Sequence, residues 1–141
     1  PQNPNSPAEV DSLHLTNLES TARVFSTRYG STSIQDPNGL RVVLPYTSAR
    51  LAPILQANIT DLASRDVPSI SIVTLTKAYV ITPGNVTTTN ATVTVSTVRQ
   101  ETVGNGPTKQ TRQDIVLQMV REKNIWVVDQ LQWGEATLYG N

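Results

Sequence analysis

Two side chains in this 141-residue chain stand out as candidates for acid–base chemistry. His14 is the single histidine, and an unperturbed imidazole titrates near neutral pH. It lies four residues before Leu18 and beside an apolar helical stripe. That position favours a structural role on the flank of an amphipathic helix over a role in proton transfer.

Asp129 is the second candidate. Its face of a predicted strand carries four apolar residues, whose desolvation of the carboxylate would raise its pKa: Ile125, Val127, Leu131 and Trp133. A carboxylate in such a concave apolar site suits proton abstraction. The alternative is that strand twist turns Asp129 toward solvent or toward Arg121, and we favour this alternative.

The residue types in the chain allow few other catalytic or metal sites. Asp114 and Glu101 could form a paired-carboxylate site, although their spacing across a hairpin is not specified by the sequence. The chain has no cysteine, which excludes disulfides, thiolate nucleophiles and cysteine metal sites. One histidine excludes a multi-histidine metal centre, and no phosphate loop or nucleophile elbow is present. We therefore assign no catalytic residue, cofactor or metal beyond the weak candidates Asp129 and His14.

Charge and composition exclude further classes. Eleven basic and eleven acidic residues cancel, so a nucleic-acid partner is not expected. No apolar run reaches the roughly 18 residues of a membrane span. Three Asn-x-Thr sequons, at Asn58, Asn85 and Asn90, are explained by the abundance of threonine. The sequence begins at Pro1 rather than at methionine, and we expect that a signal, an anchor or another upstream region of the gene precedes this residue.

The elements that must position these residues begin with a long helix. Residues 1–7 hold three prolines and read as a flexible arm or linker. From Ala8 an apolar stripe recurs at helical spacing and ends at Tyr29, with Gly30 as a candidate C-cap. The stripe consists of Leu15, Leu18, Ala22, Phe25 and Tyr29.

A connector and a second helix follow. Residues 31–46 are predicted to be a connector with a turn at Asp36–Gly39 and a short apolar stretch before Pro45. The second helix is predicted over about 47–63, capped by Thr47 or Ser48. Pro53 conflicts with that span, so either the helix kinks there or a single turn precedes a helix that starts at Pro53.

The second half of the chain is β-rich. Four strands are predicted at 69–82, 91–103, 110–121 and 125–133, joined by short turns that favour an antiparallel meander. Trp126 and Trp133 are seven residues apart, an odd number. They should therefore point to opposite faces of the last strand.

This order of elements predicts an α+β fold, with two N-terminal helices packed on a strongly curved, four-stranded antiparallel sheet. We expect a single domain over residues 8–141. Strands of ten or more residues must bend in so small a domain, which gives a cone. The helices decide whether the cone keeps an open pocket.

Two stretches resemble the nuclear-transport-factor-2-like superfamily. The strand Ile125-Trp126-Val127-Val128-Asp129, with Trp133 close behind, is similar to its C-terminal signature. The helix ending at Tyr29 and the run Leu44-Pro45-Tyr46-Thr47 are similar to its opening. The nearest variant in outline is the extracytoplasmic domain of membrane-anchored bacterial proteins, such as the scaffold subunits of type IV secretion and conjugation machines. This fold hosts many functions, so the resemblance transfers no catalytic role.

Two functions follow as hypotheses. The first is a non-enzymatic, extracytoplasmic assembly domain that binds other protein subunits or further copies of itself and is anchored by a segment outside this sequence. The second is a small-molecule-binding protein or an isomerase- or cyclase-like enzyme, with Asp129 and His14 lining an apolar pocket. A deep pocket containing Asp129 would favour the second hypothesis, and a cone filled by Phe25, Tyr29, Leu55 and tryptophan side chains would exclude it.

Overall fold

The computed structural model describes residues 7–33, 36–66 and 70–138, with side chains from Asn17 onward. The predicted arm at residues 1–6 lies outside this part of the chain, and Pro7 already belongs to the first helix. The elements, in chain order, are α1 (Pro7–Tyr29), β1 (Thr32–Ser33), the 3-10 helix η1 (Pro37–Tyr46), α2 (Leu51–Ala63), β2 (Ile72–Gly84), β3 (Asn90–Val103), β4 (Thr108–Glu122), β5 (Ile125–Trp133) and β6 (Thr137–Leu138).

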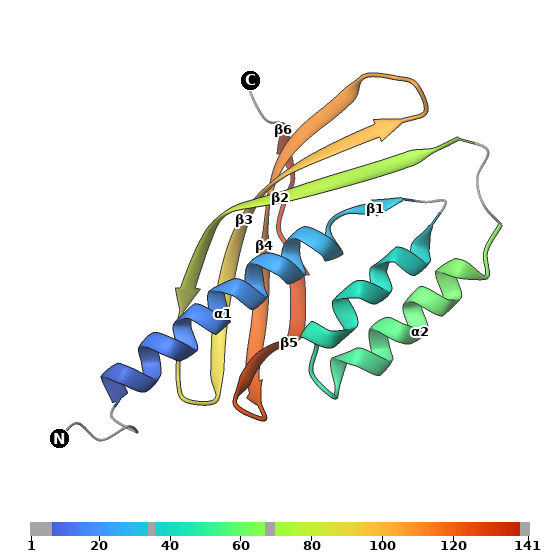
Figure 1. The fold of residues 1–141 in the computed structure, drawn as a ribbon. Helices are drawn as coiled ribbons and strands as arrows, with labels where there is room; N and C mark the ends of the chain where they lie inside the picture. Colours follow the sequence, from blue (N-terminus) through green and yellow to red (C-terminus); the bar gives the residue numbers. More distant parts are fainter. Residues whose placement is uncertain (1–6, 34–35, 67–69, 139–141) are drawn as a thin grey trace.

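The predicted α+β class is confirmed. The strands form one antiparallel sheet in the order β1-β2-β3-β4-β5, and β6 pairs with β4 beyond the end of β5. The helix α1 crosses the concave face of this curved sheet, while η1 and α2 lie side by side next to β5 (Figure 1). The prediction of four strands was short by two. Strands β1 and β6 have two residues each, too few to show an alternating pattern.

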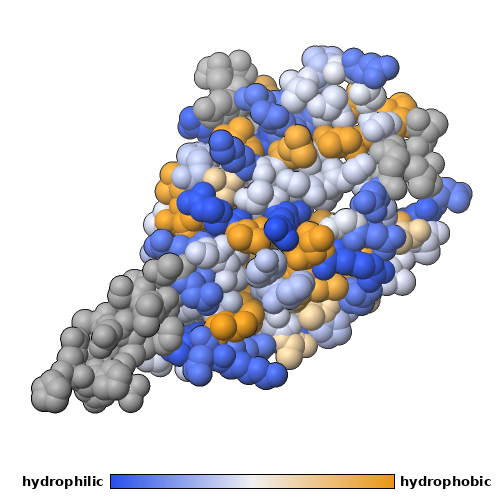
Figure 2. Space-filling model, viewed as in Figure 1, coloured by the Kyte–Doolittle hydropathy of each residue, from blue (hydrophilic) through white to orange (hydrophobic). Residues whose placement is uncertain are grey.

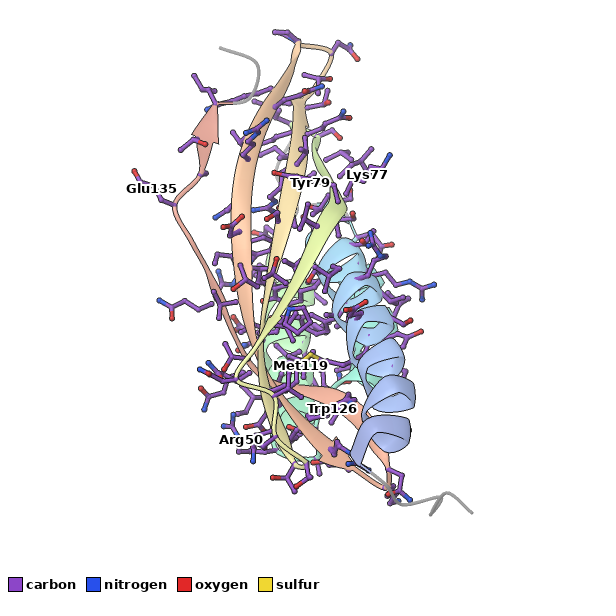
Figure 3. All side chains as sticks on the ribbon, turned by 90° about the vertical axis from the view of Figure 1, so that its left-hand side faces the viewer. Arg50, Lys77, Tyr79, Met119, Trp126 and Glu135 are labelled. Carbon is purple, nitrogen blue, oxygen red and sulfur yellow. The ribbon has the colours of Figure 1, made fainter. Side chains whose placement is uncertain are left out.

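The core lies between α1 and the sheet. The stripe residues Leu18, Ala22 and Phe25 are fully buried, as their helical spacing predicts. The facing residues are alternate positions of the central strands, namely Val93, Val95, Ile115, Leu117 and Met119. Figure 3 shows Met119 and Trp126 pointing from the sheet toward α1. Burial of this shared apolar surface fixes the helix on the sheet.

Two β-bulges interrupt the alternation of side chains. In β2 the register shifts between Ala78 and Val80, which makes Tyr79 the extra residue. In β5 Gln130 pairs with Gln118 and Val128 pairs with Met119, which makes Asp129 the extra residue. Each bulge bends its strand and increases the local twist.

The bulge at Asp129 overturns the prediction for the two tryptophans. Trp126 pairs with Arg121 and Trp133 pairs with Ile115, and both partners share one face of β4. An extra residue between the tryptophans restores an even separation. Trp126 is therefore buried in the core and Trp133 packs against it.

The predicted connector is also corrected, because residues 37–46 form the 3-10 helix η1 with Val43 buried. In α2, Pro53 sits in the first turn, where an N–H has no helical partner in any case. The helix is thus not kinked by Pro53. The prediction of Thr47 or Ser48 as the cap is corrected in position, because Arg50 is the N-cap residue and makes no side-chain cap. Ser48 still contacts the helix start, since its Oγ accepts a hydrogen bond from the Leu51 N–H at 3.0 Å.

Gly30 follows the last residue of α1 for a reason other than a left-handed cap. A Cβ on Gly30 would lie 2.5 Å from Thr76 Oγ1, and that hydroxyl donates to the Gly30 carbonyl at 2.6 Å. Glycine is required because the end of α1 touches β2. No helix in the described part of the chain is long and apolar enough to cross a membrane.

Candidate functional site

Asp129 lies at the edge of the sheet, where β5 passes the start of α2. Its Oδ1 accepts hydrogen bonds from Ser48 Oγ at 2.8 Å and from Arg50 Nε at 3.1 Å. Arg50 Nη2 donates to Oδ2 at 3.2 Å and also reaches the Asp129 carbonyl. The Asp129 side chain is 23% exposed and that of Arg50 is 50% exposed. The carboxylate is therefore fully engaged by an ion pair and a hydroxyl.

These contacts set the protonation state of Asp129. Partial burial alone would raise its pKa, but the hydrogen bonds from Arg50 and Ser48, together with the charge of Arg50, outweigh it. The pKa of Asp129 lies below its ordinary value, which is opposite to the direction that a general acid near neutral pH requires. The ion-pair partner is Arg50, in place of the predicted Arg121.

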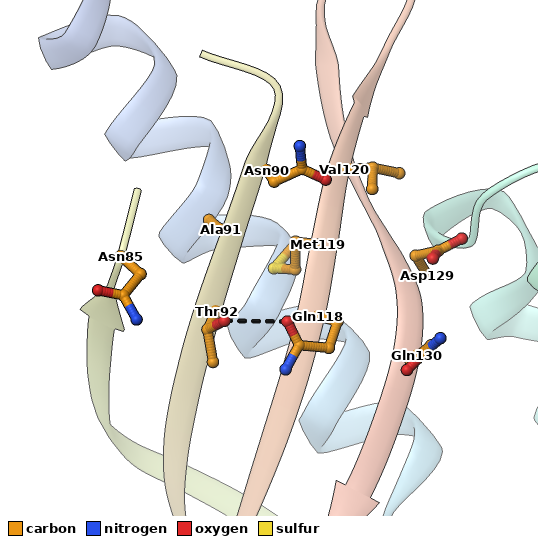
Figure 4. Close-up of a pocket in the computed structure, with 9 residues that line it drawn as sticks. All are labelled: Asn85, Asn90, Ala91, Thr92, Gln118, Met119, Val120, Asp129 and Gln130. Atoms are coloured by element: carbon orange, nitrogen blue, oxygen red, sulfur yellow. Dashed lines mark hydrogen bonds between the residues drawn. The ribbon is translucent and has the colours of Figure 1, made fainter. Parts of the chain in front are cut away.

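Two shallow hollows adjoin Asp129. One, of about 390 Å³, lies between α2 and β5 and is lined by Tyr29, Arg50, Leu51, Leu55, Asn58, Asp129, Gln130 and Leu131. The other, of about 290 Å³, lies over β3, β4 and β5 on the face away from α1 (Figure 4). Core residues form part of both walls: Leu51 and Leu55 line the first hollow, and Ala91 and Met119 line the second.

A column of aromatic side chains lies between α1 and the sheet. Phe25 and Tyr29 stack with their ring centroids 5.2 Å apart, and Tyr29 stacks on Trp133 at 6.5 Å. The guanidinium of Arg99 lies 4.4 Å from the centroid of the Trp133 ring, a cation–π contact. Burial raises the pKa of Tyr29 against the effect of Arg99. This column packs against the core between α1 and the sheet.

The other sequence candidates are not brought together with Asp129. His14 belongs to α1, and its side chain lies outside the described residues. Glu101 pairs with Lys109, whereas Asp114 pairs with Ser96, five residues away along β3. An odd separation also places Glu101 and Asp114 on opposite faces of the sheet. The predicted paired-carboxylate site is therefore not formed.

No group of three histidine, cysteine, aspartate or glutamate side chains within the described ranges could hold a metal ion. Sequence reasoning missed Ser48 and Arg50 as partners of Asp129. They lie 81 and 79 residues away along the chain, and no local pattern indicates a contact of that range.

Apolar side chains are scattered over the surface. Figure 2 shows them interspersed with polar residues on the face that carries α1. The most exposed large apolar residues are Leu138 at 57%, Leu75 at 56% and Ile70 at 55%. Single exposed apolar residues are normal on soluble domains.

No family model and no curated protein matches this sequence. Three solved structures share its fold. CagV, a VirB8 homolog of the type IV secretion system from Helicobacter pylori strain 26695, superimposes with a TM-score of 0.60 at 9% identity over 85% of this chain and 98% of CagV. A protein from Novosphingobium aromaticivorans assigned as a scytalone dehydratase gives 0.61 at 11% identity over 95% and 93%.

The third is the intermembrane space region of the chloroplast protein ARC6, with a TM-score of 0.50 at 13% identity over 92% of this chain and 98% of that region. At these identities the likeness concerns the fold. The chain thus has a nuclear-transport-factor-2-like fold that resembles VirB8-type domains.

Proposed function

We propose that this chain is a non-enzymatic, extracytoplasmic assembly domain of a membrane-anchored bacterial protein that binds other subunits of a secretion or conjugation machine. The proposal rests on two observations, the aromatic column inside the cone and the ion pair of Asp129. Phe25, Tyr29 and Trp133 stack within the cone, and Asp129 is held ionised by Arg50 and Ser48. A catalytic domain of this architecture needs an open pocket with an acid or base inside it.

Two of the solved structures with this fold support an extracytoplasmic assembly function. CagV is by name a homolog of a type IV secretion protein, and the ARC6 region is by name located in an intermembrane space. The dehydratase-like neighbour shows that this fold also accommodates enzymes. The choice between these functions rests on the aromatic column inside the cone. Anchoring through a segment outside this sequence is part of the proposal.

Protease accessibility tests the location. The natural full-length protein, tagged at its C-terminus, is expressed in its own host, and spheroplasts are treated with protease. We expect the domain to be degraded while a cytoplasmic marker protein stays intact. Protection of the domain in intact spheroplasts would exclude an extracytoplasmic location.

Site-specific photocross-linking tests the interaction. Leu75 lies on β2 and is 56% exposed on the face away from α1; a photoreactive amino acid there should give discrete cross-links to other subunits. The matched control carries the same amino acid at Arg65, after the end of α2, where we expect no discrete product. Absence of any product at Leu75 in the assembled state would contradict the proposal.

The Asp129→Asn variant separates assembly from catalysis. It removes the negative charge but keeps the side-chain size and a hydrogen-bond acceptor for Ser48. An assembly domain should retain its cross-links and its function in the host at neutral pH. Loss of function with fold and cross-links unchanged would favour the enzymatic alternative.

A further inference from the structure

Parts of both edges of the sheet are closed by specific hydrogen bonds. On the β2 side, Ser31 Oγ accepts from the Thr76 N–H at 2.9 Å and Arg23 donates to the Ala78 carbonyl at 2.9 Å. On the β5 side, Asn17 Oδ1 accepts from the Trp126 N–H and the Ser48 N–H donates to the Val128 carbonyl, both at 2.8 Å. Capped edges of this kind resist pairing with other strands.

The second half of β5 lacks such a cap. The Gly134 N–H donates to the Asp114 carbonyl, toward β4. Because inward and outward groups alternate along a strand, the backbone groups of Leu131 and Trp133 point away from β4. Among the described residues, none forms a hydrogen bond with these outward N–H and C=O groups. Two residues of open edge therefore follow directly after the Asp129 bulge.

The space beside this edge is not filled by α2. The hollow of about 390 Å³ between α2 and β5 includes Gln130 and Leu131 in its wall. Past β5, the chain continues along the same side of the molecule, where Glu135 points outward in Figure 3. An extended chain lying along this edge would meet the half-buried side chain of Leu131.

One cation, Arg99, lies close to the open edge. Arg99 lies over the Trp133 ring and donates to Thr76 Oγ1 at 3.2 Å, to Gln113 Oε1 at 2.8 Å and to the Gly30 carbonyl at 3.4 Å, all neutral acceptors. No carboxylate of the described residues lies within 4 Å of its guanidinium. Glu101 acts on Arg99 only through space. A half-buried cation without an ion-pair partner favours an acidic group in whatever binds there.

We propose that the open edge of β5 at Leu131 and Trp133 is a strand-addition site. It takes an extended segment of a partner protein that carries an acidic side chain beside Trp133 and Arg99. The main-chain hydrogen bonds provide the affinity, and the acidic residue provides the selectivity. This inference rests on the proposed assembly function and names the surface and the chemistry of the partner.

Amide hydrogen exchange of the isolated chain, followed by NMR, tests whether the edge is free. The N–H groups of Gln130 and Gln132 point toward β4 and should be protected, whereas those of Leu131 and Trp133 should exchange at least about tenfold faster. Equal protection of all four amides would show that the edge is already covered and would overturn the proposal.

A display library of random peptides, each of roughly a dozen residues, tests the occupant. Selection on the wild-type chain should enrich peptides with alternating apolar and polar residues and at least one Asp or Glu. Leu131→Pro removes the N–H of residue 131, which points away from β4 and forms no hydrogen bond within the sheet. This change should weaken peptide binding at least about tenfold. The matched control Leu131→Ala keeps the N–H and should weaken binding by less than about threefold.

Arg99→Gln tests the acidic preference. It should weaken an enriched acidic peptide more than the same peptide with Gln in place of its acidic residue. If Arg99→Gln lowers the affinity for the two peptides equally, Arg99 does not contact the acidic residue of the bound segment. The strand-addition site itself would be overturned if the enriched peptides bind the Leu131→Pro variant as tightly as the wild-type chain, or if no peptide is enriched at all.

Sedimentation of the chain alone addresses a second copy as the occupant. Self-association that Leu131→Pro abolishes would show that the edge pairs with another copy, which contradicts the choice of a partner protein. Failure of all edge tests while Leu75 still cross-links to other subunits would leave the assembly function intact and place its interface elsewhere.

Discussion

Asp129 illustrates how a residue's contacts outweigh its sequence neighbours. Its strand is apolar on both sides, which suggests a desolvated carboxyl group with a raised pKa. The β-bulge instead turns Asp129 toward Arg50 and Ser48. The resulting ion pair links β5 to the start of α2, so the carboxylate holds two elements together.

The lowered pKa of Asp129 makes stability depend on pH. A carboxyl group whose folded pKa is depressed stabilises the fold above its unfolded pKa, and this stabilisation is lost as the pH falls through the folded pKa. Asp129→Asn should therefore cost about 1–2 kcal/mol at pH 7, and the cost should shrink below about pH 4. Urea unfolding at several pH values measures the difference in unfolding free energy between the wild-type chain and this variant. A cost that is independent of pH would contradict the ion pair.

Gly30 allows α1 to end directly against β2. Gly30→Ala would place a Cβ 2.5 Å from Thr76 Oγ1 and 2.9 Å from the Ser26 carbonyl oxygen. We expect a loss of about 2 kcal/mol in unfolding free energy. The matched control is Gly84→Ala, whose Cβ would meet only the Thr92 carbonyl oxygen at an ordinary 3.7 Å. Similar costs for the two variants would refute the close contact.

At the scale of elements, the turn between β4 and β5 sets the register that places Asp129. Lys123 has φ 53° and Asn124 has φ 67°, the left-handed pair that a two-residue hairpin turn requires. Asn tolerates this conformation, whereas Lys adopts it at a cost. The turn is therefore kept by the pairing of its flanking strands.

Lys123→Gly should relieve that cost. Glycine adopts positive φ freely but loses more entropy on folding, so we expect a net gain of about 0.5 kcal/mol. The same change at Lys109 in β4, a strand position, should instead destabilise by about 0.5–1 kcal/mol. Thermal unfolding of both variants measures the difference. Destabilisation by Lys123→Gly would mean that the Lys123 side chain contributes more than its backbone costs.

At the scale of the whole molecule, one core joins both halves of the sequence. Phe25 from α1, Val43 from η1 and Leu55 from α2 share a single cluster with residues of β2–β5. The aromatic column of Phe25, Tyr29 and Trp133 extends that cluster along the cone. The packing of this column against the core contributes to stability.

Phe25→Ala should therefore destabilise the entire domain, by about 3–5 kcal/mol. Helix content from circular dichroism and tryptophan fluorescence should report the same unfolding transition, because the helices and both tryptophans share the core. If the Phe25→Ala variant does not fold, the smaller change Phe25→Leu allows the same measurement on a folded chain. Separate transitions for the two signals would show that α2 and η1 unfold independently of the sheet.

The sequence by itself determined the α+β class, the long helix from Ala8 to Tyr29 and the burial of its stripe residues Leu18, Ala22 and Phe25. These follow from local periodicity, which acts within a few residues. Only the tertiary structure decided the two bulges, the shared face of Trp126 and Trp133, and the pairing of Asp129 with Arg50. One extra residue in a strand reverses every later side chain, and a contact over 79 residues leaves no trace in local spacing.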